Sequence, residues 1–218
     1  MPFLLADGLD VILPDEAKAA EDTNLLVFHS VGDTGGIHGN DDEKAISDAM
    51  DNQISGASAE NPAPAFYYNL GDVVYFNGES NLYPSQFYEP YQNYHAAIFA
   101  IPGNHDCDTS TRPGDPVDTE PSLFGFMRNF CDTMSHYDSP YRPTMTQPYV
   151  YWTLETPFAT IVGTLFECGR HARRKRDKRA TAVVSESGIQ RGEGQSVANC
   201  STPPSVLARH HTRRLPGH

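Results

Sequence analysis

Three short apolar runs, each ending in a glycine and a polar side chain, form the main pattern of the first half of the chain. The runs at residues 25–29, 65–70 and 97–101 have the length and composition of buried strands. After each run, a turn-forming glycine precedes an acidic or amide side chain: Asp33, Asp72 and Asn104. In α/β proteins, ligands bind beyond the carboxyl ends of the strands. The pattern therefore predicts that these three corners present chemistry at one edge of a sheet.

Helical spacing between these runs predicts an alternating α/β arrangement. Residues 42–54 form the clearest predicted helix, with Ala45, Ile46, Ala49 and Met50 on its apolar face. The remaining predicted elements are a short helix at 15–20, a helical segment from 85, a helix at 122–134, and strands at 149–154 and 158–162. The stretch 109–120 is rich in Pro and acidic residues, which predicts a loop.

The order of the corners carries more information than any single residue in them. A Gly-Asp pair such as Gly32-Asp33 is also a common turn, and Asp72 in isolation could equally be a turn residue or a helix cap. The three corners are the Gly-Asp-Thr-Gly of residues 32–35, the Gly-Asp-Val-Val-Tyr of 71–75 and the Gly-Asn-His-Asp of 103–106. Together they resemble the calcineurin-like metallophosphoesterases, and the first two are most similar to the purple acid phosphatase branch.

This resemblance covers residues 25–163 and three of the family's usual five sequence blocks. It implies an α/β fold, a layered β-sandwich flanked by helices that is incomplete at the C-terminus. It also implies hydrolysis of a phosphate ester at a dinuclear metal site, with Fe and a partner Fe, Zn or Mn. The residues that the resemblance implicates are Asp33 as terminal ligand of the first metal, Tyr75 as its phenolate ligand, Asp72 as bridging carboxylate, Asn104 as ligand of the second metal, and His105 as general acid or phosphate-binding group.

The chain departs from the family pattern in two places. Gly35 occupies the place where many relatives have His, and Tyr75 compensates for that change in the purple acid phosphatases. The three His ligands of the last two family blocks are absent as written, and the C-terminal histidines, which follow no predicted strand, receive no role: His210, His211 and His218. Asp106 is expected either to orient His105 or to cap the next helix.

Charge and composition narrow the class of partner. The formal charge of −12 argues against general nucleic-acid affinity, and no apolar run has the length of a membrane span. The N-terminus lacks a basic segment before an apolar one, so we expect no signal peptide and a cytoplasmic location. The four cysteines are widely spaced; Cys107 and Cys131 are expected to be free thiols, with mutual pairing as the alternative.

Charge changes sign near residue 163. Residues 1–163 carry 5 Lys and Arg against 24 Asp and Glu, whereas 164–218 carry 11 against 4. The sequence thus predicts part of a metallophosphoesterase domain at 1–163 and a basic, disordered tail at 164–218.

The tail can also be interpreted as out-of-frame translation. When the tail is back-translated and read one nucleotide later, 164–172 can encode LYSNVGGML and 202–216 can encode HHPPYSLDTTHGGYP. Both strings resemble family segments, so out-of-frame translation is one hypothesis. An inactive truncated fragment and a non-catalytic binding module are the alternatives to an enzyme.

Overall fold

The protein is a mixed α/β structure with two small sheets. The computed structural model describes residues 6–36, 39–107, 120–165 and 183–186. One sheet is wholly parallel, with the order β2-β3-β4, and consists of β2 (His29–Val31), β3 (Phe66–Asn69) and β4 (Ala97–Ala100). The other is mixed, with the order β1-β5-β6-β7, and consists of β1 (Ala6–Gly8), β5 (Trp152–Glu155), β6 (Ala159–Gly163) and β7 (Val183–Glu186). In it, β1 pairs parallel with β5, and the other neighbours are antiparallel.

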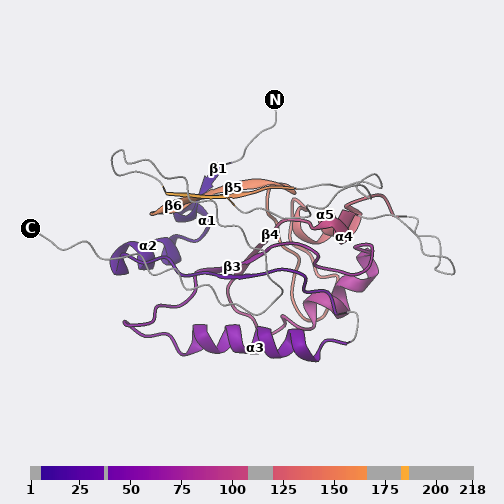
Figure 1. The fold of residues 1–218 in the computed structure, drawn as a ribbon, viewed down its shortest axis with the longest axis horizontal. Coiled ribbons are helices and arrows are strands. Elements are labelled where there is room, and N and C mark those ends of the chain that lie inside the picture. The colour runs from indigo at the N-terminus through magenta and orange to yellow at the C-terminus, as the bar shows by residue number, and fades with distance from the viewer. Residues whose placement is uncertain (1–5, 37–38, 108–119, 166–182, 187–218) are drawn as a thin grey trace, which may run out of the picture.

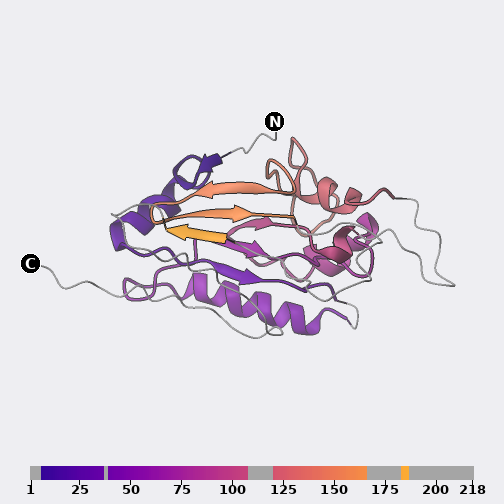
Figure 2. The same cartoon turned by 45° about the horizontal axis from the view of Figure 1, so that its top comes forward.

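Helices cover the parallel sheet and connect its strands. The longest, α3 (Asp41–Ser55), lies on the face of the parallel sheet that points away from β5 and β6 (Figures 1 and 2). Three acidic residues in its first turn suit the positive end of the helix dipole. The other helical elements are α1 (Leu9–Ile12), α2 (Pro14–Thr23), η1 (Ser80–Leu82), η2 (Pro84–Tyr88), α4 (Asn104–Cys107) and α5 (Phe124–Phe130).

Strand β3 divides the apolar core into two clusters. Tyr67 packs into one cluster with aromatic residues that include Phe87, Tyr91 and Phe126. Its neighbours along the strand point to the opposite face, as the two-residue period of a strand requires. There, Phe66 and Tyr68 pack against residues of the second sheet: Trp152, Leu154 and Ile161. Because both faces of β3 are covered, all four of its residues are buried.

Most of the predicted elements are present, with shifted ends. The predicted strands at 65–70, 97–101, 149–154 and 158–162 correspond to β3, β4, β5 and β6, and the first strand begins later than expected, at His29. The helix predicted at 122–134 is shorter, because Cys131 leaves it to form a bridge with Thr146. Strands β1 and β7 were not predicted, and the loop expected at 109–120 lies almost wholly outside the described residues.

Two expectations are wrong. Helix α3 is present, but Ala45, Ile46 and Ala49 are exposed and its buried positions are Glu43, Ser47 and Met50. Polar residues at two of the core-facing positions hid the true apolar face from a pattern based on hydrophobicity. The cysteine expectation also fails in part, because Cys107 is disulfide-bonded while Cys131 is free, so these two do not pair.

The coarse fold class agrees with the sequence. The α/β class is confirmed, whereas the metallophosphoesterase-like sandwich remains a prediction. Within the described ranges, no helix is long and apolar enough to cross a membrane. The boundary predicted at residue 163 also remains a prediction; β7, which begins at Val183 on the far side of it, pairs antiparallel with β6.

Candidate metal centre

The three predicted corners meet at the carboxyl ends of the parallel strands. Backbone hydrogen bonds continue the sheet beyond the strands: Asp33 N donates to Gly71 O at 3.0 Å, and Thr34 N donates to Asp72 O at 3.1 Å. On the other side, Ile101 N donates to Asn69 O at 3.1 Å. Asp33 lies 39 residues before Asp72 in the sequence, and Asn104 lies 32 residues after it. The sheet brings these three corners to one edge, as predicted.

The two carboxylate corners adopt an unusual backbone conformation. Asp33 has φ of 56° and Asp72 has φ of 53°, which places both in the left-handed region. Among non-glycine residues Asp tolerates this region comparatively well, yet such residues are uncommon and concentrate at functional sites. Both aspartates therefore serve as turn residues while their carboxylates remain available at the edge of the sheet.

Tyr75 reaches the first corner. Its Oη donates to Asp33 Oδ1 at 2.8 Å, across 42 positions of sequence. Gln86 holds the backbone of Tyr75, accepting from its N at 2.9 Å and donating to its O at 3.0 Å. The structure thus brings Tyr75 and Asp33 together, which is the pairing that the sequence predicted for the first metal.

The second and third corners are in direct contact. His105 N donates to Asp72 Oδ1 at 2.8 Å. A Cβ atom at Gly103 would lie 2.2 Å from the same oxygen and 2.3 Å from Asp72 N. Only glycine permits this approach of the two corners. Asn104, the predicted ligand of the second metal, follows Gly103 directly and is the first residue of α4.

Burial and neighbouring acids hold Asp72 and Tyr75 toward their neutral forms. Burial raises the pKa of Asp72, the nearby Asp33 carboxyl raises it further, and the bond from the His105 amide opposes these effects. The pKa of Tyr75 is also raised, first by burial and then by its bond to Asp33. A bound cation favours the charged form of each group. The electrostatics of this edge therefore fit a cation as the complement.

His105 is fixed in one orientation. Its Nδ1 lies 2.8 Å from Phe76 O, and its ring centroid is 4.5 Å from that of Tyr75. Because a carbonyl oxygen only accepts, Nδ1 must carry the hydrogen of this bond. Nε2 is then the nitrogen that remains for a substrate or ligand.

Asp106 has a role that the sequence did not reveal. We expected it to orient His105 or to cap a helix. The first use is wrong, because Phe76 O is the partner of the His105 ring, whereas the bond from Gly103 N to Asp106 Oδ2 does cap the start of α4. The Asp106 carboxylate accepts from the backbone N–H groups of Gly103, Val73 and Val74. Nothing in the sequence distinguishes an Asp that orients the preceding His from an Asp that binds the backbone of a neighbouring corner.

The donor set suits half of a two-metal site. Carboxylate, phenol and amide oxygens are ligands for hard cations, and the corners supply two carboxylates, one phenol and one amide. Over the described ranges, no group of three or more His, Cys, Asp and Glu is arranged to hold a metal. The predicted ligands Asp33 and Asp72 are only two residues of those types, and the C-terminal histidines lie outside the described residues.

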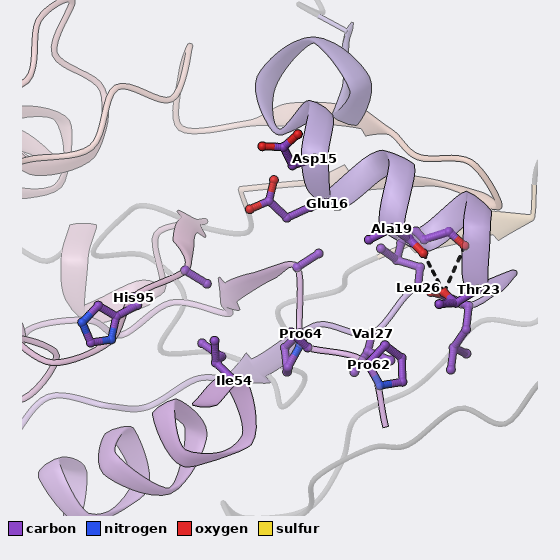
Figure 3. Close-up of a pocket in the computed structure, with 15 residues that line it drawn as sticks. Asp15, Glu16, Ala19, Thr23, Leu26, Val27, Ile54, Pro62, Pro64 and His95 are labelled. Carbon is purple, nitrogen blue, oxygen red and sulfur yellow. Dashed lines mark hydrogen bonds between the residues drawn. The ribbon is translucent and has the colours of Figure 1, made fainter. Parts of the chain in front are cut away.

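A separate pocket lies at the opposite ends of the parallel strands. Its volume is about 310 Å³, and it opens between α2 and the segments that lead into β2, β3 and β4. Figure 3 shows Asp15 and Glu16 on α2 at one side, with Ile54 and His95 across from them. None of the predicted site residues lines this pocket. The candidate metal centre is therefore the polar edge formed by the corners and not this pocket.

No family model, curated protein or solved structure matches this chain. The likeness to metallophosphoesterases therefore rests on the three corner motifs and on the geometry described above.

Proposed function

We propose that the corners are the metal-binding half of a calcineurin-like metallophosphoesterase site of the purple acid phosphatase type, which hydrolyses phosphate esters. The observation that carries this proposal is the convergence of Asp33, Asp72 and Tyr75 at one sheet edge, with Tyr75 Oη on Asp33 Oδ1. A Tyr four residues after a Gly is otherwise most often a packing residue. In this proposal, the two sheets correspond to the layers of the family's β-sandwich, since Phe66, Trp152 and Ile161 pack between them.

Each corner residue has a role in this proposal. Asp33 and Tyr75 would hold the first metal, Asp72 would be the carboxylate shared by both metals, and Asn104 would bind the second metal through its amide oxygen. Two bound ions would activate a water molecule and neutralise the oxygens of the phosphate. The hydrogen bond to Phe76 O orients His105, so that Nε2 can protonate the leaving oxygen or bind the phosphate.

A second candidate function is supported by the missing nitrogen ligands. In the described residues of the corners, His105 is the only histidine, and it is not one of the predicted metal ligands. A chain without the three further histidines would be a non-catalytic form that binds metal weakly, or a phosphate-binding or protein-binding module with a basic tail. For the latter, removal of 164–218 is expected to abolish capture of the partner.

Binding of Mn²⁺ tests the site in the chain as written. Titration followed by electron paramagnetic resonance should show weaker binding for Asp72→Asn than for wild type, because the bridging carboxylate is lost. Asp48→Asn is the control, since among the described residues this side chain pairs with Lys44 on α3, away from the corners. Equal Mn²⁺ affinity in wild type and Asp72→Asn would refute the site. In a protein with the shifted frame restored, Asp72→Asn and His105→Ala are expected to abolish hydrolysis of p-nitrophenyl phosphate without unfolding the protein.

A further inference from the structure

The Asp106 side chain connects the second and third corners. It is 1 % exposed, and its Oδ2 accepts from Gly103 N at 2.8 Å. The same carboxylate accepts from Val73 N at 3.1 and 3.2 Å and from Val74 N at 3.2 Å. One carboxylate therefore binds the backbone just before Asn104 and also the backbone just after Asp72.

The surrounding chain leaves this carboxylate little freedom. A Cβ atom at Gly78 would lie 2.7 Å from Asp106 Cα, so the loop that follows Tyr75 packs directly on the Asp106 backbone. Four hydrogen bonds from backbone N–H groups engage both oxygens of the carboxyl group. A displacement of either corner would lengthen several such bonds at once.

We infer that Asp106 is a positioning residue that sets the spacing between the Asp72 corner and the Asn104 corner, and so directs their side chains to a common point. The identity of the ligand at that point rests on the proposed function. A hydrogen bond from His105 N to Asp72 Oδ1, 2.8 Å long, also links these corners. It involves no atom of Asp106, so its loss in an Asp106 variant would report the spacing itself.

Amide hydrogen exchange and Mn²⁺ binding of the full 218-residue chain test this inference. In Asp106→Asn, an amide nitrogen faces the backbone donors in place of an acceptor oxygen. We expect exchange at the His105 amide, measured relative to the β3 amide of Tyr68, to become about tenfold faster or more. We also expect Mn²⁺ affinity to fall about 10- to 100-fold, the usual effect of losing a group that supports metal ligands.

Asn129→Ala is the matched control. Asn129 is equally buried at 1 % exposure, and its side chain bonds Tyr88 Oη at 2.6 Å and Gly125 O at 2.8 Å, away from both corners. Its loss should lower the free energy of unfolding without changing the relative exchange at His105 or the Mn²⁺ affinity. If the control changes both as strongly as Asp106→Asn does, Asp106 contributes general stability only and the inference is overturned.

The remaining outcomes separate the inference from the proposed function. Unchanged relative exchange at His105 in Asp106→Asn overturns the inference, and so does unchanged Mn²⁺ affinity when the wild type binds the ion. Faster exchange together with no Mn²⁺ binding by the wild type supports the positioning role and refutes the metal site. If Asp106→Asn does not fold, Asp106→Glu replaces it: the acceptor is kept but displaced by about 1.5 Å, and unchanged exchange and affinity there again overturn the inference.

Discussion

Glu43 is a buried carboxyl without a partner, and its replacement should stabilise the protein. It is 7 % exposed, in the first turn of α3, and neither carboxylate oxygen has a hydrogen-bond partner among the described residues. It faces Tyr67 and Tyr91, whose hydroxyl pKa values are themselves raised in part by the Glu43 charge. Burial raises the pKa of Glu43 from 4.5 to about 9. The folded protein therefore keeps Glu43 protonated at neutral pH.

The size of the effect follows from proton linkage. Between pH 4.5 and 9 the folded state holds one proton on Glu43 that the unfolded state releases. The free energy of unfolding then falls by about 1.4 kcal/mol per pH unit, because the unfolded state binds fewer protons. The stability associated with neutral Glu43 is fully present below pH 4.5 and is lost as the pH rises toward 9. At pH 7 the free energy of unfolding is therefore about 3 kcal/mol lower than near pH 4.5, which is a large share of the stability of a typical domain.

Glu43→Gln removes this penalty and keeps the shape of the side chain. We expect the variant to match the wild type near pH 4.5, and to be more stable by about 3 kcal/mol at pH 7. Urea unfolding from pH 5 to 8 measures the difference, with fluorescence of the single tryptophan, Trp152, as the signal, since it is 3 % exposed in the fold. Asp42→Asn is the control, because it removes an exposed charge from the same helical turn. If Glu43→Gln keeps the wild-type dependence on pH, Glu43 is ionised in the folded protein and the reasoning fails.

Three further predictions concern the gene, the corners and the edge of β4. Sequencing the gene across the tail should show codons that read LYSNVGGML and HHPPYS one nucleotide later; codons that forbid these strings would refute the frameshift hypothesis. Gly103→Ala should lower the free energy of unfolding by about 1–3 kcal/mol, because its Cβ would meet Asp72 Oδ1 at 2.2 Å. Chemical denaturation checks this, and Gly56→Ala, whose Cβ would lie 3.0 Å from Asn52 O, is expected to cost less. Gln147→Ala should lower the free energy of unfolding by about 1–3 kcal/mol in the same assay, because the Gln147 amide accepts from Ala100 N and donates to Ala100 O, both at 2.9 Å. An unchanged free energy of unfolding would show that Gln147 does not stabilise the edge of β4.

Local signals were sufficient to predict the corners but not everything around them. Each parallel strand is followed by a glycine and a polar residue, and the carboxyl ends of parallel strands share an edge, so the pattern predicts both the strands and the approach of Asp33, Asp72 and Asn104. The place of Tyr75 was implied only by the family resemblance. Strands β1 (Ala-Asp-Gly) and β7 (Val-Val-Ser-Glu) show neither an apolar run of strand length nor an alternation of apolar and polar residues, so the pattern does not predict them. They form by pairing with β5 and β6, which is information that lies elsewhere in the chain.

The errors occurred where tertiary structure assigns a polar residue to the interior. Helix α3 has helical spacing, yet its buried positions are Glu43 and Ser47 as well as Met50, so hydrophobicity placed the apolar face incorrectly. Asp106 is a similar case, because its carboxylate is fully used by backbone donors from two different loops. A buried acid is energetically unfavourable unless it is neutral or hydrogen-bonded. Burial raises the pKa of Asp106 to about 7, and the hydrogen bonds from Gly103, Val73 and Val74 oppose this shift. Glu43, which lacks donors, is held neutral and can be replaced to advantage, whereas Asp106, which has four hydrogen bonds, should be costly to replace.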